Sequence, residues 1–243
     1  MRLTSLLSLV FLAFVFVGCD SGGDEGITIL SVTPDNGNGG VSVTITGENF
    51  GDATAGLSVR FGPTSATVTS VSETQIVTTV PDGAPIGATT IQVSRGDDTD
   101  AIDFTVNDPL VGNWVSEGTN IAPLLAAPPF NTVRITADFR ADGTYTVVTT
   151  DASNSEVTLT GTWQATAGEG TIRNVTVSQS APTTLTSAGI YQNLDGVLTY
   201  EVAQTNPPLT GVTPPTAAAG FGSTSGGNFM QLNVQRYVRA TAQ

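Results

Sequence analysis

The sequence contains no histidine and no lysine, and Cys19 is its only cysteine. Without histidine, the chain can form neither a serine–histidine triad nor a histidine-ligated zinc site. Without lysine, it can form neither a Schiff base nor a phosphate-binding P-loop. A single cysteine excludes an internal disulfide, so burial of apolar side chains must stabilise the fold. From these absences we expect no enzymatic activity, no cofactor and no metal.

Positive charge is also scarce. Eight arginines stand against 21 acidic residues, which gives a formal net charge of −13. Nucleic-acid binding needs a basic surface, and docking on anionic lipids through side chains needs one as well. We therefore expect no nucleic-acid partner. The excess of carboxylates is typical of a surface that keeps a protein dispersed in solution.

The longest apolar run of the sequence stands at its N-terminus. Leu6 to Val17 is apolar except for Ser8, and it follows the positive charge of Arg2. This length suits the core of a signal peptide and is shorter than the roughly 20 residues that a membrane-spanning helix needs. The run therefore predicts export of the protein.

The end of this run, Phe16-Val17-Gly18-Cys19, resembles the lipobox of bacterial lipoproteins. The resemblance implies that residues 1–18 are a signal peptide and that Cys19 becomes an acylated N-terminus, carrying fatty acids such as palmitate. Residues 19–26 would then be an acidic tether with glycine and serine. The alternative is an ordinary secretory signal followed by an incidental cysteine.

Two features of the tether bear on localisation. Asp20, directly after Cys19, is similar to the inner-membrane retention signal of enteric bacteria, whereas the acidic tether with Asp24 and Glu25 is similar to surface-export signals. We expect a lipid-anchored protein of the cell envelope, at the outer membrane or cell surface. The membrane is thus its expected partner through Cys19.

Residues 27–107 form the first expected domain. Val41 to Thr46, for example, alternates valine or isoleucine with serine or threonine, which predicts a half-buried strand. Seven such runs with turn residues between them indicate an antiparallel β-sandwich. The runs are 27–33, 41–46, 57–61, 66–71, 75–80, 89–94 and 101–106.

The amino-acid sequence of this segment resembles the IPT/TIG family of immunoglobulin-like domains. The resemblance rests on several motifs in order: Pro34, Gly39-Gly40, Val43 to Gly51, Val59 to Gly62, Thr74 to Ile76, Val80-Pro81 and Gly87. Domains of this family are spacers or binding modules in surface proteins. The resemblance therefore implies no chemistry.

Two local patterns of this domain invite a functional interpretation. Arg95-Gly96-Asp97 is an integrin-type tripeptide, but its position between two strands favours a hairpin turn. The four aspartates from Asp97 to Asp103 lack the spacing of an EF-hand loop, which needs glycine at its sixth position. We interpret them as a solvated turn, with an irregular cation site as the alternative.

Residues 108–243 form the second expected domain, which we predict to fold independently of the first. Asn131 to Phe139 alternates, with Val133 expected on the same inner face as Phe139. Eight runs joined mostly by local turns predict an antiparallel up-and-down β-barrel. The runs are 110–114, 131–139, 144–149, 157–163, 171–178, 189–193, 197–202 and 229–238. The fold class is thus all-β, a sandwich followed by a barrel.

The second segment resembles the lipocalin-like domains of bacterial lipoproteins. The resemblance rests on Gly112 to Trp114, Phe139 to Tyr145 and Gly161 to Trp163. It implies that a late basic residue closes the barrel over Trp114. We expect Arg236 to stack on that indole, with Arg239 as the alternative.

The candidate site residues are Trp114, Tyr145, Trp163 and Arg236, which either fill the core or line a ligand pocket. Two long connections complete the pattern. Thr119 to Phe130 is apolar enough to be a lid or a partner surface, and Thr205 to Gly227 is expected to be a flexible loop.

These features predict a non-catalytic binding or scaffold lipoprotein with an immunoglobulin-like spacer and a lipocalin-like head. Its ligand could be a small apolar molecule, a glycan or another envelope protein. One alternative is a purely structural or adhesive surface protein. Another is a glycan hydrolase that uses a pair of carboxylates, the one catalytic arrangement that the composition leaves open.

Overall fold

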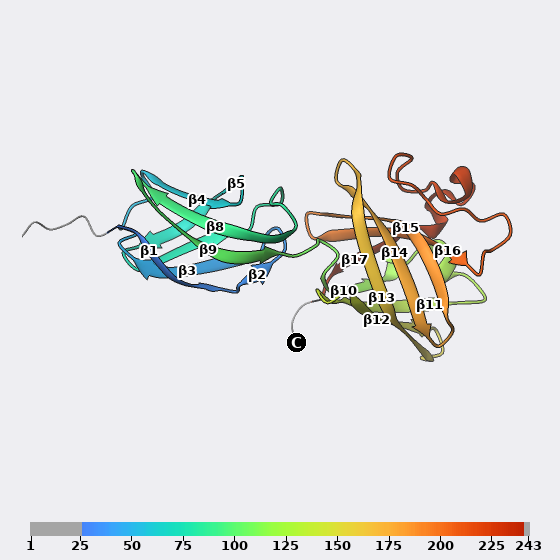
Figure 1. The fold of residues 1–243 in the computed structure, drawn as a ribbon. Helices are drawn as coiled ribbons and strands as arrows, with labels where there is room; N and C mark the ends of the chain where they lie inside the picture. Colours follow the sequence, from blue (N-terminus) through green and yellow to red (C-terminus); the bar gives the residue numbers. More distant parts are fainter. Residues whose placement is uncertain (1–25, 241–243) are drawn as a thin grey trace, which may run out of the picture.

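The computed structural model describes residues 26–240, which form two β-domains joined by a short linker (Figure 1). Cys19, the expected signal peptide and nearly all of the expected tether lie outside the described residues. Among the helices of the described part, none has the length and apolarity to span a membrane.

The first domain is a sandwich of two sheets, as the alternating runs predict. One sheet has the order β1-β3-β7-β6, and the other has the order β2-β9-β8-β4-β5. The strands are β1 (Thr28–Thr33), β2 (Asn36–Gly37), β3 (Ser42–Glu48), β4 (Leu57–Phe61), β5 (Thr64–Ala66), β6 (Val68–Ser72), β7 (Gln75–Thr79), β8 (Gly87–Arg95) and β9 (Asp98–Val106).

Two details of the sandwich differ from the expectation. The expected strand 66–71 is divided between β5 and β6, which belong to different sheets. The sandwich is not wholly antiparallel either, because the two-residue strand β2 pairs with β9 in parallel. The inner faces of both sheets are filled, with Phe50, Phe61 and Ile76 fully buried between them.

The second domain is a closed barrel of eight antiparallel strands, which confirms the predicted architecture. The strands are β10 (Gly112–Glu117), β11 (Thr132–Phe139), β12 (Thr144–Asp151), β13 (Glu156–Glu169), β14 (Ile172–Ala181), β15 (Leu185–Leu194), β16 (Val197–Asn206) and β17 (Gln235–Arg239). Each strand pairs with the next, and β17 returns to pair with β10.

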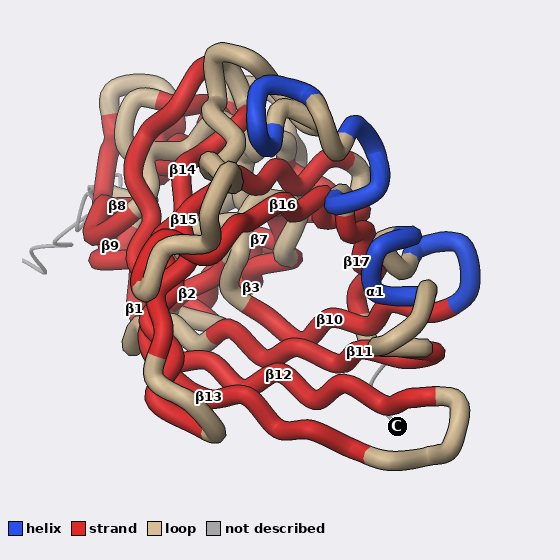
Figure 2. Tube along the Cα trace, turned by 90° about the vertical axis from the view of Figure 1, so that its right-hand side faces the viewer, coloured by secondary structure: helices blue, strands red, loops and turns tan. Residues whose placement is uncertain are grey.

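The barrel has two different ends. The turns after β11, β13 and β15 lie at the end where the linker enters, which we call the linker end. The connections after β10, β12, β14 and β16 lie at the opposite end, which we call the distal end. Figure 2 looks at the molecule from its right-hand side in Figure 1, with the helix α1 (Pro123–Ala126) beside the barrel strands.

The inner face of β11 differs from the prediction at its first residues. Ile135, Ala137 and Phe139 are buried, but Val133 is 46% exposed. The register with β12 shifts between Thr132 and Arg134, so one extra residue enters the strand there. Because side chains alternate with a period of two, this bulge moves Val133 to the outside and buries Thr132 instead.

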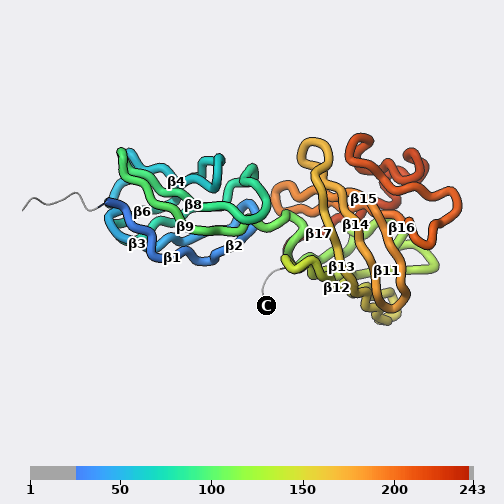
Figure 3. The backbone as a smooth tube through the Cα atoms, in the orientation of Figure 1, coloured from blue at the N-terminus to red at the C-terminus, as the bar shows by residue number. Residues whose placement is uncertain are grey.

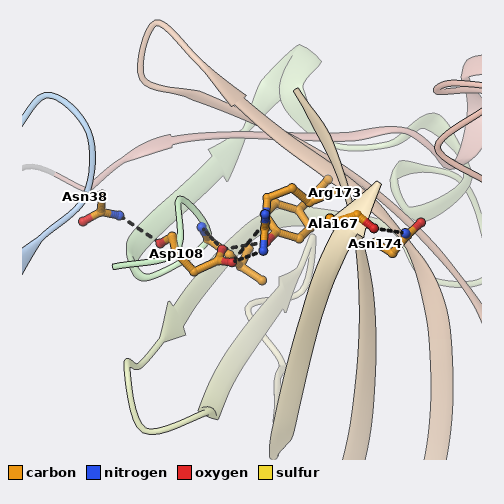
Figure 4. A network of polar contacts seen from close by, with 7 residues as sticks. Asn38, Asp108, Ala167, Arg173 and Asn174 are labelled. Atoms are coloured by element: carbon orange, nitrogen blue, oxygen red, sulfur yellow. Dashed lines mark hydrogen bonds and ion pairs between the residues drawn. The ribbon is translucent and has the colours of Figure 1, made fainter. Parts of the chain in front are cut away.

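The linker is fixed by the side chain of Asp108. Its carboxylate accepts hydrogen bonds from the Tyr191 hydroxyl (2.6 Å), from the Leu110 amide (2.9 Å) and from the Arg173 guanidinium, which also pairs with it at 3.1 Å. Across the junction, the side-chain amide of Asn38 donates to the Asp108 and Val111 carbonyls (Figure 4). The first domain, the linker and the barrel are thus connected by one polar network.

The long connection between β16 and β17 is not the flexible loop that its composition predicts. It contains two short 3-10 turns, η2 (Thr224–Gly227) and η3 (Met230–Asn233), so the predicted strand 229–238 begins only at Gln235. The loop folds back over the outer face of β16, where Glu201 is fully buried. The Glu201 carboxylate accepts hydrogen bonds from the Gly222 amide (2.6 Å), the Thr224 amide (3.1 Å) and the Thr224 hydroxyl (2.5 Å).

We expect Glu201→Gln to lower the free energy of unfolding of the barrel by about 1–3 kcal/mol, because an amide group would face buried N–H donors that need an acceptor. Urea unfolding followed by tryptophan fluorescence measures this, since both tryptophans of the chain, Trp114 and Trp163, are in the barrel. Glu169→Gln is the matched control at an exposed position and should change stability by less than about 0.5 kcal/mol. Equal stability of the two variants would contradict the role of Glu201.

Candidate functional site

The linker end of the barrel is closed by the guanidinium group of Arg239, which lies on the indole ring of Trp114. The guanidinium carbon of Arg239 lies 4.1 Å from the centroid of the Trp114 ring, and its Nη1 donates to the Val111 carbonyl at 3.0 Å. Trp114 and Arg239 are register partners on β10 and β17. Trp114 itself is 1% exposed, and its indole N–H donates to the Leu110 carbonyl at 2.8 Å.

The contact between Arg239 and Trp114 explains why the residue two positions before Trp114, Gly112, is a glycine. Gly112 has a positive φ of 142°, and a Cβ atom there would clash with Nη1 of Arg239. Only glycine lets the arginine lie across the strand and reach the indole.

The prediction that Arg236 covers Trp114 is wrong, and the alternative, Arg239, does so. Gln235 and Tyr237 are buried on the inner face of β17, so the intervening Arg236 points outward and is exposed. Arg239 has the same parity as Tyr237 and therefore turns toward the barrel end.

The barrel interior carries all four tyrosines of the chain, Tyr145, Tyr191, Tyr200 and Tyr237. Phe139 lies among them, with ring centroids 5.8 Å from Tyr145 and 6.1 Å from Tyr200. The Tyr200 and Tyr237 rings are 6.4 Å apart. Aromatic rings from β11, β12, β16 and β17 thus converge inside the barrel.

The hydroxyl groups of these tyrosines differ in their partners. Tyr191 is saturated, because it donates to Asp108 and accepts from Arg173 Nε at 2.9 Å. The hydroxyls of Tyr145, Tyr200 and Tyr237 make no hydrogen bond to another residue of the described chain. Each of the three oxygens retains some accessible surface, so none is a fully enclosed group without a partner. They are polar groups available to a bound molecule.

Electrostatics keep these three phenols neutral. Burial, followed by the neighbouring phenolic groups of Tyr237, Tyr145 and Tyr191, raises the pKa of Tyr200 well above its usual value. Burial likewise raises the pKa of Tyr237 and of Tyr145. At physiological pH the three groups are therefore uncharged donors and acceptors.

The interior is less enclosed toward its distal half. Val147, Leu159 and Val202 face inward and pack against the aromatic cluster, yet each retains partial solvent exposure. Inward-facing residues near the linker end, such as Trp114 and Tyr191, are almost completely enclosed. Access to the interior is therefore easier from the distal end than from the linker end.

The rim of this open end is apolar and exposed. Two connections without any charged residue, 118–133 and 202–235, supply most of it. Met230 is 69% exposed and Phe130 is 52% exposed, and four more large apolar side chains of the same end are exposed: Leu124, Val157, Leu209 and Leu232. Exposed apolar side chains at one end of a domain are candidates for an interaction surface.

The apolar segment that suggested a lid is fixed rather than free. Gln235 is buried, and its side chain accepts a hydrogen bond from the Ala122 amide at 2.8 Å and donates to Ser116 and to the Asn120 carbonyl. Ile121 and Ala122 are buried, whereas Leu124 and Phe130 remain exposed. The segment seals the wall beside the seam between β10 and β17 and presents its remaining apolar side chains at the rim.

The structure places the other predicted site residues as follows. Trp163 is buried against Phe139, and its indole N–H donates to the Arg140 carbonyl at 3.2 Å, so it fills the core. Tyr145 belongs to the tyrosine cluster. The sequence analysis missed Tyr200 and Tyr237, although the alternation of β16 and β17 carries the signal that both face inward.

The prediction of a turn holds for Arg95-Gly96-Asp97 but not for the other aspartates, because Asp98, Asp100 and Asp103 lie on strand β9. Arg95 and Asp98 are register partners at the end of the β8–β9 hairpin, with Gly96 and Asp97 between them. In residues 26–240, no group of three or more histidine, cysteine, aspartate or glutamate side chains is placed to hold a metal ion.

We expect Arg239→Ala to destabilise the barrel by about 0.5–1 kcal/mol, because it removes a cation–π contact at a position that is partly open to solvent. Arg239→Lys should recover only part of this loss, since lysine lacks the flat head that stacks on the indole. Urea unfolding monitored by tryptophan fluorescence provides the measurement. Arg236→Ala on the same strand is the control and should leave stability within about 0.5 kcal/mol of the wild type; equal losses at both positions would contradict the assignment.

Comparison with known proteins identifies part of the chain. The family model of the IPT/TIG domain matches residues 28–110. No curated protein matches the sequence.

Solved structures show only a distant likeness. A protein of unknown function from Bacteroides thetaiotaomicron is 16% identical, with 74% of this chain and 56% of that chain covered and a TM-score of 0.34. An auxiliary nutrient binding protein from the same organism is 14% identical, with 74% and 58% covered and a TM-score of 0.32. One from Bacteroides ovatus is 17% identical, with 68% and 46% covered and a TM-score of 0.31.

The chain thus spans about half the length of these proteins. Similarity this low does not extend to a ligand. Sequence and fold agree on the first part of the molecule: residues 28–110 are an IPT/TIG domain with an immunoglobulin-like sandwich, followed by a closed eight-stranded barrel.

Proposed function

We propose that this protein is a non-catalytic binding protein of the bacterial cell envelope, anchored by lipid at Cys19. The IPT/TIG domain is the spacer, and the barrel is the head that binds a ligand. The ligand is a small uncharged molecule with an apolar body and at least one hydrogen-bonding oxygen.

The tyrosine cluster carries this proposal. A buried tyrosine hydroxyl usually has a hydrogen-bond partner in the protein. The rings of Tyr145, Tyr200 and Tyr237 belong to one aromatic cluster, and none of the three hydroxyls has a partner in the described chain. A barrel that served only as a rigid support would gain stability from phenylalanine at these positions.

The direction of the barrel supports the same interpretation. The end that faces the linker is closed by Trp114 and Arg239, and the network around Asp108 fixes it to the first domain. The open end and its apolar rim lie at the opposite side of the barrel. A head whose opening points away from its support leaves that opening accessible.

The arrangement of carboxylates favours binding over hydrolysis. The two most enclosed acidic groups, Asp108 and Glu201, are both saturated by hydrogen bonds to the protein. Neither has an oxygen that is free to serve as a nucleophile or as a general acid.

We predict that prodan, an uncharged fluorescent naphthalene ketone, binds in the barrel and that Tyr200→Phe weakens its binding by about two- to tenfold, the effect of one lost hydrogen bond. The blue shift and the increase of prodan emission on titration with protein give the dissociation constant. Binding that Tyr200→Phe and Tyr237→Phe leave unchanged would contradict a site at the tyrosine cluster.

The free energy of unfolding should distinguish the Tyr200 hydroxyl, which has no partner in the described residues, from the Tyr191 hydroxyl, which binds Asp108. Tyr200→Phe removes a group that has no protein partner, so the free energy of unfolding should stay the same or rise. Tyr191→Phe removes the hydrogen bond to Asp108 and should lower the free energy of unfolding by about 1–3 kcal/mol. The pair is matched in chemistry, and a similar loss of stability in both variants would mean that Tyr200 is structural too.

The lipid anchor makes a separate prediction. Cells that express the protein and receive a labelled fatty acid should incorporate the label, and Cys19→Ala should abolish it and release the protein from the membrane fraction. Two or more acyl chains give stable attachment, whereas one binds reversibly. An unlabelled wild-type protein would refute lipid anchoring but would leave the ligand site untouched.

A further inference from the structure

The outer wall of the barrel carries a groove, whose lining also includes Tyr145, Gly161 and Gln179 at the inward-facing positions of the same strands. It crosses β12, β13 and β14 and has a volume of about 570 Å³, within the range of known ligand sites. The outward-facing side chains that line it are almost all hydroxylated: Thr144, Thr146, Thr160, Thr162, Ser178, Ser180 and Thr184, with Arg140 at one end.

The concave shape follows from a bulge between β13 and β14. The register shifts between Thr160, which opposes Ala181, and Gly161, which opposes Gln179, so β14 has an extra residue, Ser180. A bulge increases the local twist and bends the strand. Gly161 is required there because a Cβ atom would clash with the Ser178 carbonyl oxygen.

The hydroxyl groups form rows across the three strands. Thr144 opposes Thr162, and Thr162 opposes Ser178, while Thr146 opposes Thr160 on the neighbouring row. Neighbouring strands are about 4.7–4.9 Å apart, so the rows present hydroxyls at regular intervals. Threonine on a strand has few rotamers, and its hydroxyl loses little freedom when a ligand binds.

Arg140 is the one charged residue among those that line the groove. It forms an ion pair with Asp138 at 2.6 Å and donates to the Thr144 and Thr146 hydroxyls at 3.3 and 3.2 Å. Its charge is further offset by Asp142, whose carboxylate accepts a hydrogen bond from the Thr144 hydroxyl at 2.6 Å. A protein with a net charge of −13 also repels polyanions.

These properties select one class of ligand. An apolar ligand would leave without partners the hydroxyls of Thr160, Thr162, Ser178 and Thr184, which make no hydrogen bond within the described residues, at a cost for each. A protein partner would find none of the exposed aromatic residues that dominate such interfaces. A neutral polyhydroxylated chain can both donate to and accept from each serine and threonine.

We propose that this hydroxyl groove, lined by Thr144, Thr146, Thr160, Thr162, Ser178, Ser180, Thr184 and Arg140, is a binding site for a neutral oligosaccharide. Tyr145 is the one residue that this lining shares with the tyrosine cluster of the barrel interior. The protein would then hold a glycan on the wall of its head and a small molecule within it.

The test is a titration of the ¹⁵N-labelled protein with cellohexaose, maltohexaose and chitohexaose, followed by amide chemical shifts. At least one oligosaccharide should produce saturable shifts on β12, β13 and β14 around the groove. Thr160→Val and Ser178→Ala should each weaken its binding by about two- to tenfold, because each removes a hydroxyl contact while it preserves the strand.

The chain offers matched controls on the same strands and the same outer face. Thr158→Val on β13 and Thr176→Ala on β14 lie outside the groove lining and should leave the affinity unchanged. Saturable shifts from none of the three oligosaccharides would overturn the proposal, as would equal losses in the controls.

Two further comparisons test the ligand class and the independence of the sites. Tighter binding of dextran sulfate than of dextran would show that the groove prefers anions, which would also overturn the proposal. Tyr200→Phe should weaken prodan binding and leave oligosaccharide binding intact, and loss of oligosaccharide binding in that variant would move the glycan into the interior. Failure of the glycan prediction would leave the prodan prediction standing, and the reverse also holds.

Discussion

Closure between β10 and β17 is the constraint on which the rest of the head depends. The pairing of these strands is short, with only Trp114 opposite Arg239 and Val115 opposite Val238. Side chains complete the seam: Arg239 lies on the indole, and Gln235 binds the segment that follows β10. If this seam opened, the sheet would have two edges, the tyrosines would lose their shared space, and the distal rim would separate from the wall that it surrounds.

Sequence alternation was sufficient to predict the strands but not their phase at irregular points. The barrel and the sandwich follow from runs that keep a period of two. The period fails locally where an extra residue enters β11 before Arg134, and this moves Val133 outward. The alternation of inward and outward side chains also could not be extended from the preceding residues into β17. The 3-10 turn Met230–Asn233 precedes this strand and interrupts the period of two. Arg236 and Arg239 face opposite sides of β17, so an error of one residue in the alternation is enough to assign the inner position to the wrong arginine.

The candidate site was predicted less well because its residues are ordinary ones. Tryptophan is the usual marker of a ligand platform, but Trp114 and Trp163 serve the core here. The proposed site rests on the absence of partners for the Tyr200 and Tyr237 hydroxyls within residues 26–240, which no sequence pattern reveals. Glu201 is similar, since a lone carboxylate in a strand is normally exposed. It is buried only because residues 222–224, some 20 positions later, fold back to bind it.

The position of the Asp108 network also determines how the molecule responds to mechanical tension. A pull on the N-terminal segment passes through the sandwich and reaches the barrel at Asp108, where Arg173 and Tyr191 share the load with the backbone. Both anchoring residues belong to strands of the closed end, β14 and β15. The load at the junction is therefore shared by two barrel strands at the closed end and does not fall on the linker backbone alone.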